Sequence, residues 1–503
     1  MKMGLYIYLV FFSCTTLFAS GSLNQKVGEK CDSAQLFVCF STVTTAIDDF
    51  ENIWALSFKG SILSMYKSTD LANSFENPLT IASNIRVDNH GDGRPQLKID
   101  GSHIYITYVK KTNRKYQGKL YIRVFDIDSN FLSKEVQVSD EKNPVSQRFQ
   151  SLNIVDNKAY LFWLDKRSKL PNSKKPLSSL YHAVFDRKTM TMSKNVLIKE
   201  NTCQCCRISV ARQGRSFYVF YRDLKSGSIR DFTLTSFNMD SKKINHIELF
   251  KDQWKIKGCP HHGGALSIEN GVIHSVRFSG NPKSLGLKYQ SIKNGQTLRE
   301  MPFGDNNKQA AHPFVVARNK SVFIVYKEFD GVWTKILLLE SHNQGLSFSE
   351  PVVIAKSTGH NDHPFLISKG AKLYLSWQRY KEGLLFKEIK SNQLNILRFN
   401  LSTFGLLSNH LNSQTCIFWS IYCSECLKKL NGLKGSDLNA THFINMDEYD
   451  DLQLVKDKIV EFELTGQKNY LIEPLEQQKI RYMFDKTWRG ELPKSYKIGG
   501  NND

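Results

Sequence analysis

The sequence lacks long apolar runs and is short of acidic residues. Beyond residue 21, no stretch has the roughly eighteen uncharged apolar residues that a membrane-spanning helix needs, so we expect the body of this 503-residue chain to be soluble. Asp and Glu number 48 against 68 Lys and Arg, which gives a net charge of +20. The basic residues are scattered, which argues against nucleic acid and favours acidic glycans or an anionic envelope surface as neighbours.

The first residues have the layout of a secretory signal. Lys2 precedes an apolar run, and small residues follow near Ala19. We therefore expect residues 1–21 to be a signal peptide and the protein to be exported, periplasmic or secreted, to a compartment where cysteines oxidise. A lipid anchor on Cys14 is less favoured, because two phenylalanines nearby are poor residues before a lipidated cysteine.

A repeating pattern occupies the first four hundred residues. Each copy has a short strand, a turn of the Asp-Gly or Asn-Lys type and an alternating aromatic strand. Six clear copies begin at Arg94, Arg148, Arg207, His262, His312 and His363, and a looser one begins near Thr42. Three or four antiparallel strands in about 50 residues, repeated along the chain, are typical of a propeller. We predict a mainly β fold with seven blades over residues 31–390, or six if the first copy completes the last blade.

Two turns resemble the Asp-box of sialidase-type propellers, S-x-D-x-G-x-(S/T)-(W/F). They are SHNQGLSF at 341–348 and STDLANSF at 68–75, where alanine replaces the glycine. The motif is structural, because its Asp or Asn caps a turn and its Gly adopts a left-handed conformation. It indicates architecture without indicating activity.

Longer motifs resemble a family of exported bacterial propellers that are often labelled sialidase-like. They are CQCCR at 203–207, WKIKGCPHHG at 254–263, and the blade openings AHP at 311–313 and DHP at 362–364. The resemblance covers residues 31–390 and implies a sialidase-like propeller, but it implies no established activity.

The repeat alignment places cysteines and histidines around one mouth of the central channel. The candidate metal ligands are Cys203, Cys205, Cys206, Cys259, His261, His262, His312 and His363, and we expect Cys39 to lie near them. Export favours disulfides among these cysteines and Cys31, whereas thiolates with imidazoles favour copper or zinc. Both interpretations require Cys259 to lie close to at least one cysteine of the CQCCR stretch.

A third interpretation is glycoside hydrolysis. Arg94, Arg148 and Arg207 open blades and could imitate the arginine triad with which sialidases clamp a carboxylate. However, the F-R-I-P stretch that supplies the first arginine in sialidases is absent. We therefore expect structural or ligand-binding arginines at the channel mouth and no cleavage of a sialoside.

The last hundred residues have a different pattern. After a linker at 391–411, an apolar strand leads into C-x-x-C at Cys423 and Cys426, which opens a helix. A second strand and Pro493 follow in an order that resembles the thioredoxin fold. We expect a small α/β thioredoxin-like domain at 412–503, shortened because the chain ends where that fold normally adds a strand and a helix.

The chemistry of this domain follows from the arrangement. A helix N-terminus favours the thiolate of Cys423, and Cys426, one turn on, is the resolving thiol. Pro493 matches the cis-proline that faces the disulfide in the thioredoxin fold. Tyr422 replaces the usual tryptophan.

The sequence therefore favours an exported thiol-disulfide oxidoreductase. Its propeller would present a partner, a metal or a glycan to the C-x-x-C domain, whose partners are client or reductant protein thiols. The alternative is a non-catalytic propeller that binds copper, zinc or a glycan.

Overall fold

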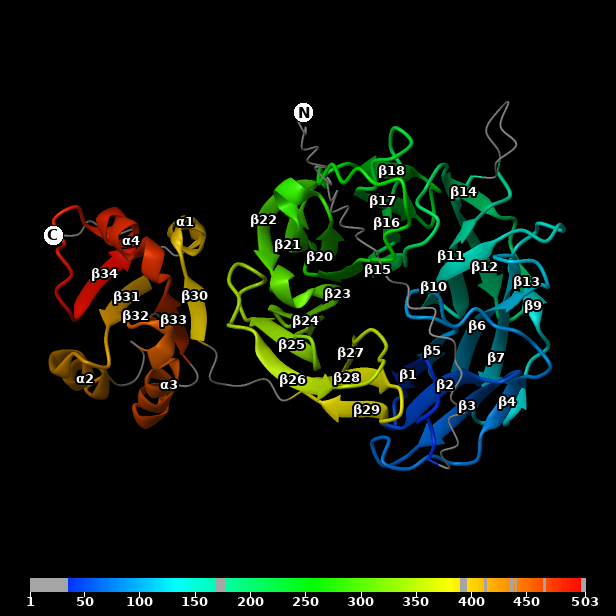
Figure 1. Ribbon diagram of the computed structural model, residues 1–503, viewed down its shortest axis with the longest axis horizontal. Helices are drawn as coiled ribbons and strands as arrows, with labels where there is room; N and C mark the ends of the chain where they lie inside the picture. Colours follow the sequence, from blue (N-terminus) through cyan, green and yellow to red (C-terminus); the bar gives the residue numbers. More distant parts are fainter. Residues whose placement is uncertain are drawn as a thin grey trace, which may run out of the picture.

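The computed structural model describes residues 35–168, 177–389, 396–410, 414–433, 438, 441–464 and 467–498. These residues form a ring of radial sheets and a smaller α/β body built from the last hundred residues (Figure 1). The expected signal segment at 1–21 lies outside the described residues. No helix in the described ranges is long and apolar enough to cross a bilayer.

Each sheet of the ring is built from antiparallel strands that follow one another in sequence, because short turns connect them. The first blade contains β1 (Val43–Ile47), β2 (Ile53–Lys59), β3 (Ile62–Ser68) and β4 (Leu79–Ala82). The second contains β5 (Gln96–Asp100), β6 (His103–Lys111), β7 (Gly118–Asp126), β8 (Phe131–Leu132) and β9 (Val136–Gln137). The third contains β10 (Gln147–Val155), β11 (Lys158–Asp165), β12 (Ser179–Asp186), β13 (Thr191–Met192) and β14 (Val196–Lys199).

Four further blades complete the ring. The fourth contains β15 (Ser209–Gln213), β16 (Ser216–Arg222), β17 (Phe232–Asn238) and β18 (Ile244–Ile247). The fifth contains β19 (Ala265–Glu269), β20 (Val272–Ser279), β21 (Gly286–Lys293) and β22 (Gln296–Phe303). The sixth contains β23 (Ala311–Arg318), β24 (Ser321–Phe329), β25 (Thr334–Ser341) and β26 (Val352–Ser357), and the seventh contains β27 (Phe365–Lys369), β28 (Lys372–Arg379) and β29 (Gly383–Glu388).

The ring closes on seven blades. The inner strands β1, β5, β10, β15, β19, β23 and β27 contact one another in sequence order, and β27 also contacts β1. The looser first repeat forms its own four-stranded sheet, so the prediction of seven blades is confirmed and the six-bladed alternative is wrong. Hydrogen bonds also link the seventh blade to the segment before the first. The side chain of Gln378 in β28 donates to the carbonyl oxygens of Phe37 and Phe40 at 2.6 and 3.0 Å.

The hydrophobic core of the ring lies between neighbouring blades. Tyr105 of β6 and Trp163 of β11 are both 0% exposed and belong to one cluster that joins the second and third blades. Runs of consecutive buried residues, as in β6 and β11, supply this packing, because they put buried side chains on both faces of a sheet and each face meets the next blade.

The two segments that resemble the Asp-box fold alike. Ser68 and Ser341 each place a hydroxyl 2.8–2.9 Å from the acid or amide oxygen two residues on. Gly345 has a φ of +80°, and a Cβ there would lie 1.8 Å from the hydroxyl oxygen of Tyr289. Glycine is therefore required at this turn both by the backbone and by the close neighbour, whereas Ala72 adopts the same left-handed region in the other copy.

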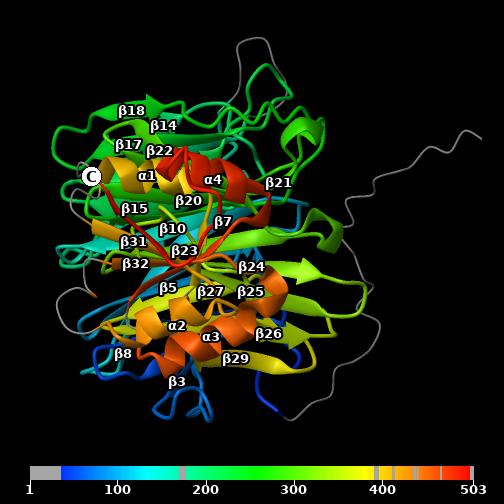
Figure 2. The ribbon, with the colours of Figure 1, turned by 90° about the vertical axis from the view of Figure 1, so that its left-hand side faces the viewer.

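The smaller body is a five-stranded mixed sheet in the order β30-β33-β32-β31-β34. Its strands are β30 (Ile396–Phe399), β31 (Gln414–Trp419), β32 (Thr441–Asn445), β33 (Lys468–Ile472) and β34 (Lys494–Ile498), and only β34 runs antiparallel to its neighbour. Its helices are α1 (Leu401–His410), α2 (Ser424–Asn431), α3 (Leu452–Glu461) and α4 (Gln477–Phe484). Helices α1 and α4 lie on one face of the sheet and α2 and α3 on the other (Figure 2). Side chains of the two pairs belong to two separate hydrophobic clusters.

The expected linker at 391–411 is wrong as a structural description. Within it, β30 pairs in parallel with β33 and α1 follows directly, so both elements belong to the smaller body. The parallel pair forms because the short apolar run at Ile396–Phe399 completes the sheet edge next to β33. Ser349 and Leu397 form an isolated bridge, which joins the sixth blade to this edge.

Candidate functional site

Cys423 and Cys426 form a disulfide at the start of α2. Cys423 caps this helix, and its Sγ accepts the backbone N–H of Cys426 at 3.1 Å. The cap arises because the chain leaves β31 at Trp419, turns through a short loop and enters the helix at Ser424. Amide groups at a helix N-terminus favour negative charge, so the Cys423 sulfur lies where a thiolate is stabilised.

The two sulfurs differ in accessibility. Cys426 is 0% exposed, beneath Trp419 and Leu430, whereas Cys423 is partly exposed. Tyr422, directly before it, is 72% exposed and donates its hydroxyl to Asp451 at 2.7 Å. A partner molecule can therefore reach Cys423 and not Cys426.

Pro493 lies beside this disulfide. The Leu492–Pro493 peptide bond is cis, and the carbonyl oxygen of Leu492 is 3.5 Å from the Cys423 Sγ. The fold thus brings together the three residues predicted for the redox site, although the proline lies about seventy residues further along the chain than Cys423.

Asp447 is a supporting residue that the sequence analysis missed. It follows β32, is 7% exposed, accepts the backbone N–H of Ile421 at 2.8 Å, and bonds the Ser420 hydroxyl. It therefore fixes the loop that positions Cys423. The signal that could have identified it is the acid near the end of the predicted second strand, THFINMDE at 441–448, on the side of the sheet where the loop with the cysteines also begins.

A second group of chemically reactive residues lies in the propeller. Cys203, Cys205, Cys206 and Cys259 are free thiols, and we call these four residues the thiol cluster. The Sγ atoms of the first three lie within 4.8 Å of one another, and Cys203 and Cys205 are 3.6 Å apart. Cys205, Cys259 and His261 form a second triad by the same measure.

The surroundings of the thiol cluster are cationic. Arg230 donates Nη1 to the Cys203 Sγ at 3.1 Å. Hydrogen bonds from the Cys205 and Cys206 thiols, together with nearby arginines, hold the pKa of Cys203 well below its ordinary value. A hydrogen bond with the Cys205 thiol lowers the pKa of Cys259 to about 5. Hydrogen bonds with the neighbouring thiols raise the pKa of Cys205, and burial raises that of Cys206. At neutral pH the negative charge of the cluster therefore lies on Cys203 and Cys259.

Three of the candidate histidines, His262, His312 and His363, form a stacked row. The ring centroids of His262 and His312 are 4.9 Å apart, and those of His312 and His363 are 3.6 Å apart. Burial lowers the pKa of His262 to about 3 and holds those of the other two well below their ordinary value. The three imidazoles are therefore neutral at pH 7 and keep a lone pair available.

Asp92 faces this row and was also missed from the sequence. Ligand atoms of Asp92, His312 and His363 lie within 4.8 Å of one another. The Asp92 side chain is buried, and neither of its oxygens has a hydrogen-bond partner among the described residues. Gly91 permits the approach, since a Cβ there would lie 2.3 Å from His363 Nε2. The HGDGR sequence before the second blade, an acid between two glycines, is the signal that could have identified it.

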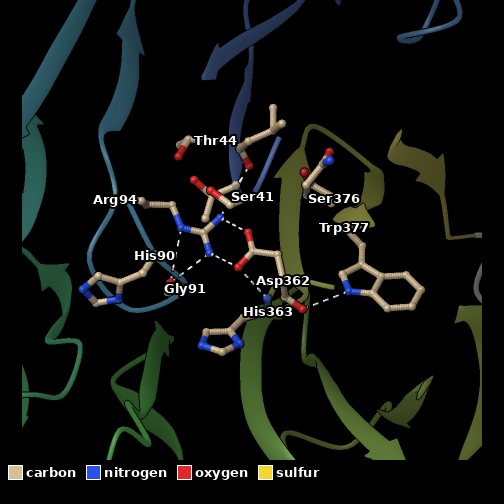
Figure 3. Close-up of polar contacts among 12 residues, drawn as sticks. Ser41, Thr44, His90, Gly91, Arg94, Asp362, His363, Ser376 and Trp377 are labelled. Carbon is tan, nitrogen blue, oxygen red and sulfur yellow. Dashed lines mark hydrogen bonds and ion pairs between the residues drawn. The ribbon is translucent and has the colours of Figure 1, made fainter. Parts of the chain in front are cut away.

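Arg94 forms an internal ion pair with Asp362. Its guanidinium lies 2.5 Å from one oxygen of Asp362 and 2.6 Å from the other, and it donates to the Gly91 carbonyl (Figure 3). Asp362 precedes the first strand of the seventh blade and Arg94 that of the second, so the pair links the two blades on either side of the first blade. Burial raises the pKa of Asp362, and the Arg94 charge opposes this rise.

The other two arginines of the expected triad also have internal partners. Arg148 bonds Asp88 at 2.6 Å and lies 2.5 Å from His90 Nε2. Arg207 donates to the Gly264 carbonyl at 3.3 Å and packs against Phe365. These contacts engage Nε and Nη2 of Arg148 and Nη2 of Arg207, whereas the buried Nη1 of Arg207 has no hydrogen-bond partner among the described residues.

Cys39, which we expected near the candidate metal ligands, is not one of the free thiols. It is disulfide-bonded, whereas all four members of the cluster are free thiols. Cys31 lies outside the described residues. Cys259, in contrast, lies within shared-ligand distance of Cys205, as both the disulfide and the metal interpretations required.

No protein-family model matches the chain, and no curated protein is similar to it in sequence. Among solved structures, the chain is similar to an α-L-arabinofuranosidase from Lactobacillus brevis, at 12% identity and a TM-score of 0.31, over 53% of this chain and 90% of that one. It is also similar to a prolyl endopeptidase, at 12% identity and a TM-score of 0.42, over 71% and 51% of the two chains.

Trypanosoma rangeli sialidase, solved with the inhibitor DANA, is a third similar structure. The identity is 12% and the TM-score 0.37, over 60% of this chain and 54% of that one. The chain spans about half the length of this sialidase and of the prolyl endopeptidase. At these identities the similarity concerns only the propeller fold, whose neighbours include sialidase- and arabinofuranosidase-type propellers.

Proposed function

We propose that the protein is an exported thiol-disulfide exchange protein whose reactive group is the Cys423–Cys426 pair. The observation that carries this proposal is the pairing of a partly exposed sulfur at a helix N-terminus with a fully buried sulfur one turn later. Disulfide exchange requires this asymmetry, because the exposed thiol forms the mixed disulfide with the partner and the buried thiol then resolves it.

The surrounding fold supports a thioredoxin-like domain. Parallel β31 and β32 flank the reactive loop, antiparallel β34 adds to the other side of β31, and the cis bond before Pro493 lies beside the disulfide. Along the chain, α3, β33 and α4 lie between β32 and β34. In the described sheet, β34 is an edge strand.

The proposed reaction conserves atoms and electrons. In the reduced protein, the Cys423 thiolate attacks one sulfur of a client disulfide, and the other client sulfur leaves as a thiolate that takes up a proton. The Cys426 thiolate then attacks the Cys423 sulfur and releases the second client thiolate. Two electrons pass to the client, the Cys423–Cys426 disulfide forms, and an external dithiol must reduce it before the next turn. The same steps in reverse oxidise a client dithiol.

The residues of the chain assist particular steps. The N–H of Cys426 and the helix N-terminus stabilise the Cys423 thiolate as attacking and as leaving group. Asp447 holds the loop at Ser420 and Ile421, so the sulfur keeps its position through both steps. We propose that the propeller presents the client to this site.

The competing function is a non-catalytic binding propeller with a vestigial C-x-x-C. Glycoside hydrolysis receives no support from the channel arginines, because Arg94 and Arg148 are paired with Asp362 and Asp88.

The test is the reduction of insulin by dithiothreitol, followed as turbidity. Wild-type protein should accelerate the reaction, and Cys423→Ser should return it to the uncatalysed rate. Cys416→Ser is the matched control, because Cys416 is a buried free thiol in the same body and should leave the rate unchanged. Equal rates for the wild type and Cys423→Ser would support the binding protein instead.

A further inference from the structure

The thiol cluster is not used by the exchange reaction proposed for the smaller body. Its four cysteines belong to the propeller, while the reactive pair lies at the start of α2. The same chain contains disulfides at Cys39 and at the reactive pair, yet the clustered cysteines remain thiols. Close, unbonded sulfurs form a set of donors that soft metal ions prefer.

Two triads of ligand atoms share one sulfur. Cys203, Cys205 and Cys206 form the inner triad, and their side chains are 1%, 4% and 2% exposed. The outer triad consists of Cys205, Cys259 and His261, in which Cys259 is partly exposed and His261 is exposed. Cys205 belongs to both, so the two triads form a path from the surface to the interior.

We propose that the inner triad binds one Cu(I) ion and that the outer triad is the entrance through which the ion arrives. Thiolate ligands select soft metal ions, of which Cu(I) and Zn(II) are the common candidates. Structural zinc takes four ligands in a tetrahedron. Within the described part of the chain, the cluster offers groups of three, and no fourth cysteine or histidine lies within the same distance of all members of the inner triad. Cu(I) accepts three-coordinate sulfur sites, so the geometry favours copper.

The charges around the inner triad fit a thiolate-bound cation. Three thiolates and one Cu(I) leave a net negative charge, which is costly in a buried site unless cations face it. Arg230 meets Cys203 directly at 3.1 Å, and the Arg222 charge also acts on Cys203. Arg230 is therefore an outer partner that orients and stabilises the Cys203 thiolate.

The ion enters by ligand exchange without redox chemistry. It first bonds Cys205, Cys259 and His261 at the surface. The bonds to Cys259 and His261 then break as bonds to Cys203 and Cys206 form, the bond to Cys205 persists, and the thiol protons that are displaced pass to water. Copper remains Cu(I) throughout.

The experiment uses the full chain with Cys423→Ser and Cys426→Ser, so that the reactive pair cannot bind the metal. Cu(I) is titrated anaerobically against the chromogenic chelator bicinchoninate. One ion should bind per chain, and Cys206→Ser should weaken binding by more than the roughly 100-fold that loss of an outer partner costs. Cys416→Ser, which removes a buried thiol outside the cluster, should leave affinity and stoichiometry unchanged.

The entrance is tested separately by the rate of loading. Cys259→Ser should slow Cu(I) uptake in stopped-flow mixing while the final stoichiometry stays at one ion per chain. Unchanged uptake would contradict an entrance at the outer triad. The Cys423→Ser, Cys426→Ser protein cannot carry out the exchange reaction. Failure of copper binding in this protein therefore contradicts the metal site alone, and failure of insulin reduction by the wild type contradicts the exchange function alone.

A second measurement needs no substitution in the thiol cluster and so does not depend on the folding of the Cys206→Ser and Cys259→Ser variants. In the Cys423→Ser, Cys426→Ser protein, bound Cu(I) should protect Cys203, Cys205 and Cys206 from alkylation during urea unfolding, as read by peptide mass spectrometry. Equal alkylation with and without Cu(I) would overturn the proposal. Zn(II) held in a four-sulfur site, with Cu(I) excluded, would overturn it as well.

Discussion

Replacement of Arg94 by methionine tests whether the channel-mouth arginines are structural. Arg94 and Asp362 have side chains that are 3% and 1% exposed, and two short contacts join them. Removing one partner of a buried pair leaves an uncompensated charge and costs about 3–5 kcal/mol. With an m-value of about 3 kcal/mol/M, the urea midpoint should fall by roughly 1 M or more. Urea unfolding of the full chain, followed by intrinsic fluorescence, measures this shift.

The loss should depend on pH in a defined direction. Burial already raises the pKa of Asp362 above its ordinary value of 3.8. Stability from a carboxyl with a raised folded-state pKa is fully present below the unfolded pKa and is lost as pH rises through the folded pKa. Without Arg94 the pKa rises further, so the deficit of the variant should be small near pH 4 and should grow towards pH 7.

Arg215→Met is the matched control. Arg215 also pairs with two acids, Asp156 and Asp240, but all three side chains are at least half exposed. Its replacement should change stability by less than about 1 kcal/mol. If Arg94→Met unfolded at the wild-type midpoint across this pH range, the reasoning would be refuted, and Arg94 would be free to bind a ligand.

Two further predictions concern a glycine of the propeller and the relative reactivity of two thiols. Gly345→Ala should destabilise it by about 1–3 kcal/mol in urea unfolding, because it combines a left-handed φ with a clash against Tyr289. Gly60→Ala shares the φ penalty but has open space around it, so an equal loss in both variants would argue against the clash. In native metal-free protein, iodoacetamide should modify partly exposed Cys259 before buried Cys416, whose pKa burial raises to about 12. Peptide mass spectrometry reads this order, and faster reaction at Cys416 would contradict the burial pattern.

The repeat pattern was sufficient to predict the ring. Short strands and turns that recur about every fifty residues marked the blades, and the copies beginning at Arg94 and His363 both open inner strands as predicted. The spacing of the repeats also predicted that Cys259 lies next to the CQCCR stretch, because consecutive blades place equivalent positions side by side.

Contacts across the ring could not be predicted from the sequence. The partner of Arg94 lies 268 residues away in Asp362, and only closure of the ring brings them together. Asp92 has no local partner that would mark it, since its neighbours His312 and His363 come from distant blades. β30 was missed because a four-residue strand becomes evident only when β33 pairs with it.

The proposed function depends on the division of roles between two sulfurs, and trapping tests that division directly. The Cys426→Ser variant, incubated with a disulfide-containing peptide, should accumulate a mixed disulfide on Cys423, because no second thiol can release it. Cys423→Ser should form none, since Cys426 is fully buried. Mass spectrometry locates the adduct. A mixed disulfide on Cys426, or equal adducts in both variants, would contradict the proposed exchange reaction.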